Sequence, residues 1–131
     1  EGRFLFPGGL GSADVPVLLT EGAVSLLEST EAVLRADRIL STDHAVAVVA
    51  AVSAYSRFTP EDLALLAGRR VRIIPDTDAA GQAGAFAWAA SLTGAGCTVD
   101  CLHPPGGHKD LGESLQAVGK YDPVWTELLS F

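Results

Sequence analysis

The stretch that decides the fold reads VRIIPDTDAAG and covers residues 71–81. Its opening is rich in β-branched apolar side chains, as in a buried strand. Asp76 and Asp78 follow directly, and a pattern typical of a helix runs from about Ala79 to Thr93. Side chains two residues apart in extended backbone point to the same side. Both carboxylates are therefore expected on one side of the connection between the strand and the helix.

Strand and helix patterns alternate on both sides of this stretch. Further strands are expected within residues 15–20, 45–54 and 97–102, with a helix as the alternative for the Ala-rich residues 45–54. Helices are expected within residues 23–36, 60–67, 111–118 and from residue 122 onward. Such alternation predicts an α/β fold with a central, mostly parallel sheet of about four strands and helices on both faces. Ligands of these folds bind beyond the carboxyl ends of the strands, which here end at Glu21, at Asp76 and near Asp110.

Length and composition indicate one globular domain. The chain has 131 residues, 48% of them apolar, which fits a single domain over residues 1–131 with its core at about 15–118. It begins at Glu1 and contains no Met, so we expect a piece of a larger protein. No long apolar run or signal peptide is evident, which predicts a soluble, cytoplasmic protein without membrane contact.

The net charge of −7 argues against a module that grips nucleic acid by bulk charge. The negative net charge does not exclude catalysis on nucleic acid, because a bound Mg²⁺ makes the local charge of a carboxylate cluster more positive. Cys97 and Cys101 would lie roughly 13 Å apart on one strand, beyond the reach of a disulfide. We therefore expect two unpaired core thiols in a reducing compartment.

Two interpretations of the acidic residues are open. Asp76 and Asp78 repel each other unless a cation intervenes, and Mg²⁺ binds through one or two carboxylates plus substrate phosphate. Glu21 at the mouth of an earlier strand would join them as a ligand or general base. In the alternative interpretation Asp76 only ends a strand, Asp78 only caps a helix, and Glu21 is a solvated turn residue.

Three segments together resemble the Toprim family: LTEG at residues 19–22, IIPDTDAAG at residues 73–81 and KDL at residues 109–111. This family has a Rossmann-like α/β fold and includes bacterial and phage primases, topoisomerases and small nucleases. The resemblance implies the following roles: Glu21 as general acid/base or metal ligand, Asp76 and Asp78 as ligands of Mg²⁺ or Mn²⁺, Asp110 as a further acidic ligand, and Gly22, Gly81 and Lys109 as cofactor or phosphate contacts.

The primase-like branch is the most similar, which implies Mg²⁺-dependent nucleotidyl transfer that makes RNA primers in DNA replication. Its partners would be a DNA template, nucleoside triphosphates, and zinc-binding or helicase domains of the parent protein. The alternatives are phosphodiester cleavage, as in a Toprim nuclease or topoisomerase, and a non-catalytic metal- or nucleotide-binding module. Ser25 and Gly112 stand where primase relatives carry acids, so a second metal site would be weaker, shifted or absent.

Other candidates have simpler explanations. The Asp pair of haloacid-dehalogenase-type phosphatases follows the first strand, which does not fit here and leaves Glu21 unexplained. Lys109 either contacts phosphate or is a solvated loop lysine. The remaining expectations are histidines without a role at His103 and His108, a solvated basic edge or parent-protein contact at Arg69, Arg70 and Arg72, and core positions for Trp88 and Trp125.

Overall fold

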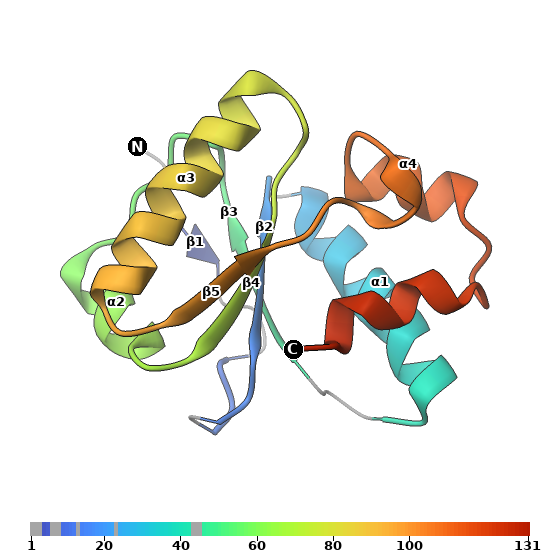
Figure 1. Cartoon of the computed structure of the whole chain (residues 1–131), viewed down its shortest axis with the longest axis horizontal. Helices are drawn as coiled ribbons and strands as arrows, with labels where there is room; N and C mark the ends of the chain where they lie inside the picture. The colour runs from blue at the N-terminus through green and yellow to red at the C-terminus, as the bar shows by residue number, and fades with distance from the viewer. Residues whose placement is uncertain (1–3, 6–8, 13, 23, 43–45) are drawn as a thin grey trace.

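The structure is a computed structural model that describes residues 4–5, 9–12, 14–22, 24–42 and 46–131, with backbone alone for residues 5 and 24–26. Within these residues one five-stranded sheet forms the centre of the molecule, in the order β1-β3-β2-β4-β5 (Figure 1). Four strands are mutually parallel: β2 (Val17–Glu21), β3 (Ala47–Ala51), β4 (Arg70–Ile74) and β5 (Thr98–Cys101). The predicted α/β class with about four parallel strands is confirmed.

Helices cover both faces of the sheet, as predicted (Figure 1). One face carries α2 (Pro60–Leu66) and α3 (Ala79–Gly94), and the other carries α1 (Val24–Leu40), α4 (Leu111–Ala117) and the 3₁₀ segment η2 (Pro123–Leu129). A short 3₁₀ turn, η1 (Pro105–Gly107), precedes α4. Two details differ from the prediction: α1 continues past Ala36, and the last element is 3₁₀ rather than α-helical. None of the described helices combines the length and apolarity needed to cross a membrane.

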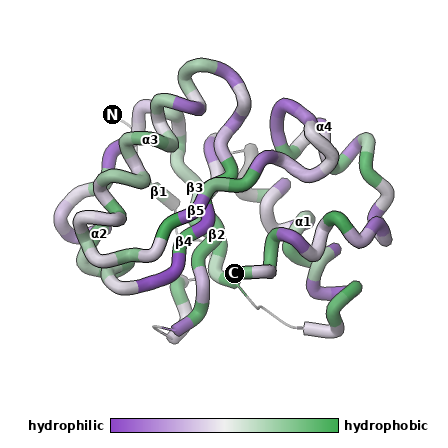
Figure 2. Tube along the Cα trace, in the orientation of Figure 1, coloured by the Kyte–Doolittle hydropathy of each residue, from purple (hydrophilic) through white to green (hydrophobic). Residues whose placement is uncertain are grey.

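The core has two layers, one on each face of the sheet. Successive residues of β2 alternate between them, with Leu19 packed in the α2/α3 layer and Leu18 in the α1/η2 layer. Trp88 and Trp125, one in each layer, are fully buried, which confirms their predicted core positions. Along α1 hydrophobic residues alternate with hydrophilic ones, as an element with one buried side requires (Figure 2).

Residues outside the predicted core range of 15–118 also pack into the core. The two-residue strand β1 (Phe4–Leu5), which the sequence did not predict, pairs antiparallel with β3. Phe4 is buried and stacks on Phe58, with ring centroids 3.9 Å apart. At the other end of the chain, Trp125 and Leu128 are fully buried beneath η2. The packed unit therefore extends on both sides of the predicted range.

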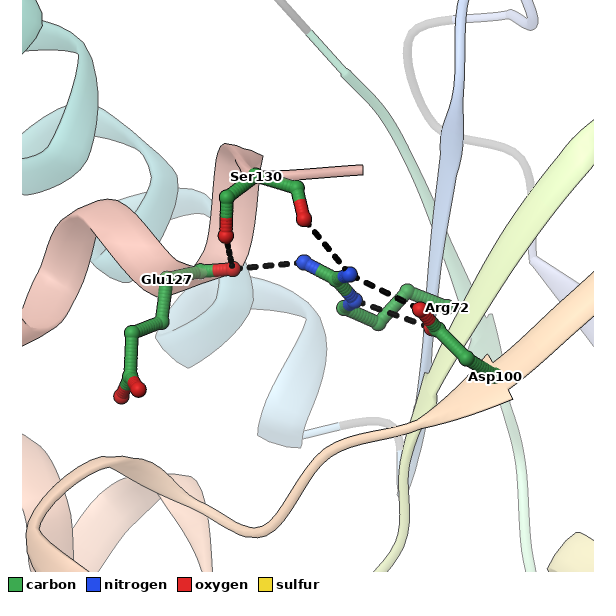
Figure 3. Close-up of polar contacts among 4 residues, drawn as sticks. All are labelled: Arg72, Asp100, Glu127 and Ser130. Carbon is green, nitrogen blue, oxygen red and sulfur yellow. Dashed lines mark hydrogen bonds and ion pairs between the residues drawn. The ribbon is translucent and has the colours of Figure 1, made fainter.

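The predicted solvated basic edge is wrong for two of its three arginines. Arg72 is 6% exposed, and its guanidinium donates to both carboxylate oxygens of Asp100, at 2.9 and 2.8 Å, and to the backbone carbonyls of Glu127 and Ser130 (Figure 3). Arg69 is 7% exposed and donates to three carbonyls, those of residues 10, 11 and 15. A planar fork of donors can be buried when it meets this many acceptors. Arg70 alone is exposed.

The prediction that the two cysteines are unpaired is confirmed, whereas the prediction that both are buried holds only for Cys97. Both thiols are free. Cys97 is buried, with its Sγ 3.1 Å from the carbonyl oxygen of Leu66. Cys101 is exposed, because β5 is an edge strand of the sheet.

The strand order reverses between β2 and β4. From β2 the chain moves to β3 on one side, and then returns to β4, which pairs with the other side of β2. In open α/β sheets such a reversal leaves a gap between the crossing helices at the carboxyl ends of the two strands, and ligands bind there. Glu21 ends β2 and Asp76 closely follows β4, so two of the predicted site residues flank this point.

Candidate functional site

Glu21 lies at the carboxyl end of β2 and is turned toward the start of α3. A Cβ added to Gly81 would lie 3.0 Å from its Oε1. This Oε1 is enclosed and has no hydrogen-bond partner among the described residues. Burial, followed by the charges of Asp76 and Asp78, raises the pKa of the Glu21 carboxyl above its usual value, and the backbone amide of Asp76 opposes the rise. A carboxyl group in this setting favours a proton or a cation.

Asp76 and Asp78 occupy the turn between β4 and α3. Asp78 is the N-cap of α3, and its Oδ1 accepts a hydrogen bond of 2.7 Å from the Gly81 amide. The alternative prediction, that Asp78 caps a helix, is therefore confirmed. Capping uses only one of its two carboxylate oxygens. Gly81 packs against the Asp76 carbonyl so closely that a Cβ would overlap that oxygen. The turn can close this tightly only because position 81 has no side chain.

Asp110 reaches the same place because the loop after β5 is bonded to the turn after β4. The carbonyl of Lys109 accepts hydrogen bonds from the Thr77 amide at 2.9 Å and from the Thr77 hydroxyl at 3.2 Å. Asp110 is the N-cap of α4, with its Oδ1 2.8 Å from the amide of Glu113. We call Glu21, Asp76, Asp78 and Asp110 the carboxylate rim.

The members of the carboxylate rim act on one another electrostatically. The pKa of Asp76 is raised to about 6, first by burial and then by the negative charges of Asp110, Asp78 and Glu28. The nearby Lys109 ammonium opposes this rise. The three sequence segments that carry the predicted acids therefore lie within electrostatic reach of one another.

Glu28 is a residue that the sequence analysis missed. Its carboxylate, from α1, fills the space beside Gly112 that a Cβ would need, and that same Cβ would lie 3.4 Å from the Oδ1 of Asp110. Its position in the sequence could have indicated it. Glu28 is three residues after Ser25, where primase relatives carry an acid, and residues three apart lie on the same side of a helix. The side chain of Ser25 itself lies outside what the structure describes.

The remaining predicted contacts also border the carboxylate rim. Gly22 has a φ of +94°, and its amide donates to the Ala51 carbonyl, so the chain turns sharply directly after Glu21. Lys109 directly precedes Asp110 and is exposed. Its ammonium group is close enough to Asp76 to oppose the rise in the pKa of that carboxyl. His108 faces Glu113 instead, with its Nδ1 3.1 Å from Oε1.

A cavity of about 520 Å³ lies at the opposite ends of the strands. It is lined by the segment from Gly9 to Gly11, by α1 and by the start of β3, and its walls are mostly apolar. Asp37 is the only carboxylate among the described residues of its lining. None of its described lining residues belongs to the carboxylate rim.

The carboxylate rim suits Mg²⁺ in its chemistry. Among the described residues, no three His, Cys, Asp or Glu side chains stand close enough to hold a metal ion by themselves. Mg²⁺ does not need such a set, since it usually binds one or two carboxylates and completes its shell with water and substrate phosphates. The unpartnered Oε1 of Glu21, the cradle left by Gly81 and the all-oxygen donors fit an ion that binds together with a phosphate.

Comparison of the chain with protein-family models, with curated proteins and with solved structures finds no match.

Proposed function

We propose that this chain is a Toprim-type catalytic domain of a primase-like protein, which carries out Mg²⁺-dependent nucleotidyl transfer on nucleic acid. One observation supports the proposal above all. Glu21 and the pair Asp76 and Asp78 come from two separate segments, and they lie within electrostatic reach of each other at the point where the strand order reverses. A catalytic α/β site is expected at such a point, and oxygen ligands there favour the binding of a divalent cation.

Each rim residue has a role in this proposal. Asp76 and Asp78 would hold the metal together with a substrate phosphate, and Asp110 would add negative charge beside them. When bound, the metal would stabilise the phosphate oxygens. Glu21, whose pKa is raised by burial, would accept the proton of the attacking 3′-hydroxyl through its unpartnered Oε1. Lys109 would contact a phosphate of the incoming nucleoside triphosphate. The parent protein would supply the basic surface for the DNA template and the zinc-binding or helicase partner domains, in the cytoplasm.

The first test is metal binding by the 131-residue chain. We expect isothermal titration to detect Mn²⁺ or Mg²⁺ binding by the native chain and a loss of affinity on the order of tenfold or more in Asp76→Asn and Glu21→Gln. Glu61→Gln is the matched control, because Glu61 is an exposed residue in the first turn of α2. Equal affinity in all four proteins would remove the basis of the proposal.

The second test separates the candidate activities. With metal, a single-stranded template and nucleoside triphosphates, formation of short RNA products supports the primase-like function, whereas cleavage of DNA supports a nuclease. Metal binding without either product supports the non-catalytic module. The absence of an acid at Gly112 and of a closed ligand set among the described residues favours that module as the second candidate.

A further inference from the structure

The cavity beside α1 has the size and the walls of a small-molecule site. Its volume is about 520 Å³, and ligand pockets commonly measure about 300–1,000 Å³. The side formed by α1 is a single stripe of that helix, with residues spaced at i, i+3, i+4 and i+7: Thr30, Val33, Leu34 and Asp37. We call this space the α1 cavity.

A second wall of the α1 cavity is fixed by hydrogen bonds. It includes Leu10, Gly11 and Val15. The backbone carbonyls of these three residues accept hydrogen bonds from the Arg69 guanidinium, at 2.6, 3.2 and 3.3 Å. Arg69 is buried, so these bonds are shielded from water. A ligand would therefore meet a wall that is already in place.

The α1 cavity is open on one side and carries a carboxylate in its depth. Leu34 is 38% exposed, and Gly9 and Gly11 are exposed as well. Asp37, one helical turn after Leu34, is only 6% exposed. The lining thus runs from residues in contact with solvent to a nearly buried charged group.

One oxygen of the Asp37 carboxylate is available to a ligand. Its Oδ1 accepts a hydrogen bond of 2.5 Å from the Thr42 hydroxyl, and its Oδ2 accepts none from the described residues. This Oδ2 is not sealed in protein, because the only enclosed side-chain polar atom without a partner, among the residues described, is the Oε1 of Glu21. No described Lys, Arg or His forms an ion pair with Asp37. A carboxylate at this depth favours a cation as its partner.

The remaining walls define the rest of the ligand. Apart from Asp37 and Thr30, the described lining residues are apolar or glycine. The carbonyls of Leu10 and Gly11 already bond Arg69. The net charge of −7 also favours the approach of a cation over that of an anion. The lining therefore suits a molecule with an apolar body and one positively charged donor.

We propose that the α1 cavity binds a small amine, whose apolar body packs against Val33, Leu34 and Val46 and whose ammonium group bonds the Oδ2 of Asp37. An apolar cavity of about 150 Å³ is enough to hold benzene, so the α1 cavity accommodates a body of about two fused rings. This inference is independent of the proposed function, because none of the described lining residues belongs to the carboxylate rim.

The test is a titration of the isotope-labelled 131-residue chain, followed by heteronuclear NMR, with three probes that share one ring system. Naphthylmethylamine is the cation, methylnaphthalene is neutral and naphthoic acid is the anion. We expect the amine to shift the backbone amides of Val33, Asp37 and Val46, and to bind on the order of tenfold or more tightly than methylnaphthalene. The anion should leave these amides unshifted.

Three variants separate the contributions of charge and space. Asp37→Asn keeps the shape of the side chain and removes its charge, so it should lose amine affinity on the order of tenfold or more and bind methylnaphthalene as the native chain does. Val33→Phe puts a ring into the cavity and should weaken the binding of both probes. Glu31→Gln is the matched control on the same helix, since Glu31 pairs with Arg35 and is not part of the described lining.

Two results would overturn the proposal. One is a titration in which the amine shifts none of the lining amides. The other is equal amine affinity in Asp37→Asn and the native chain, or equal affinity of the native chain for the amine and methylnaphthalene, since either would show that the carboxylate does not recognise the charge. Should Asp37→Asn or Val33→Phe not fold, the order of the three probes on the native chain decides. Metal binding at the carboxylate rim is measured separately and is not affected by these outcomes.

Discussion

At the scale of single residues, Asp76 carries the largest electrostatic cost of the described site. Burial and three neighbouring acids raise its pKa to about 6 from an ordinary value of 3.8. The folded chain therefore holds a proton on Asp76 at pH values where the unfolded chain has lost it. By linkage, this carboxyl lowers the free energy of unfolding as the pH rises from about 4 to above 6.

Asp76→Asn should consequently stabilise the protein at neutral and alkaline pH. The gain in melting temperature over the native chain should be largest above pH 6 and should vanish below about pH 4, where Asp76 is protonated in both folded and unfolded chains. Thermal unfolding followed by circular dichroism across pH 3.5–8 measures it. A gain that is independent of pH would show that Asp76 is not the titrating group.

Gly81→Ala should destabilise the protein, because the new Cβ overlaps the backbone carbonyl oxygen of Asp76, which cannot move without opening the turn. A loss of about 1–3 kcal/mol is expected. Gly94→Ala on the same helix is the control: nothing lies within 4 Å of the added Cβ, and alanine should stabilise by about 0.5–1 kcal/mol. Chemical denaturation of both variants checks the contrast, and equal effects would contradict the close packing at Gly81.

At the scale of elements, two helices begin on acids of the candidate site. Asp78 caps α3 and Asp110 caps α4, so each acid serves both helix and site. Asparagine caps a helix about as well as aspartate but carries no charge. Substitution with asparagine can therefore separate the two roles.

Asp78→Asn should keep the melting temperature close to that of the native chain, while Asp78→Ala should lose about 1 kcal/mol of stability through the missing bond to the Gly81 amide. Both variants should lose Mn²⁺ affinity, since each lacks the charge. Denaturation paired with Mn²⁺ titration measures the two effects side by side. Retention of metal affinity in Asp78→Asn would restrict Asp78 to its capping role.

At the scale of the whole molecule, Arg72 joins the sheet to the end of the chain. Its guanidinium, on β4, bonds Asp100 on β5 and the backbone of Glu127 and Ser130 at η2 (Figure 3). Its guanidinium carbon Cζ also lies 4.4 Å from the ring centroid of Phe131. A single side chain thus closes the C-terminal segment over the edge of the sheet.

Arg72→Met should destabilise the protein by about 2–3 kcal/mol, because two backbone carbonyls lose a charged donor. Arg72→Lys should lose less, since it keeps the charge but not the planar fork. Chemical denaturation orders the three proteins, and limited proteolysis should cut the C-terminal segment sooner in Arg72→Met. A stability equal to that of the native chain would mean that this network contributes nothing.

The sequence by itself determined the features that depend on neighbours along the chain. Apolar runs located the four parallel strands, and α2 begins where Thr59 and Asp62 form a capping box, with hydrogen bonds of 3.0 and 3.1 Å. The placement of Glu21 and Asp76 at strand ends followed as well, because parallel strands all end at one rim. Each of these signals spans only a few residues.

Tertiary structure alone decided what depends on contacts between distant segments. The edge strand β1 needs β3 as a partner, and burial of Arg72 needs acceptors from β5 and η2. The approach of Glu28 to Asp110 needs α1 and α4 packed together, with no side chain at Gly112. Whether a charged side chain is solvated or enclosed depends on the elements that pack around it. The local sequence pattern predicts that the residue lies on a helix or strand, but it does not predict which distant elements pack against that residue.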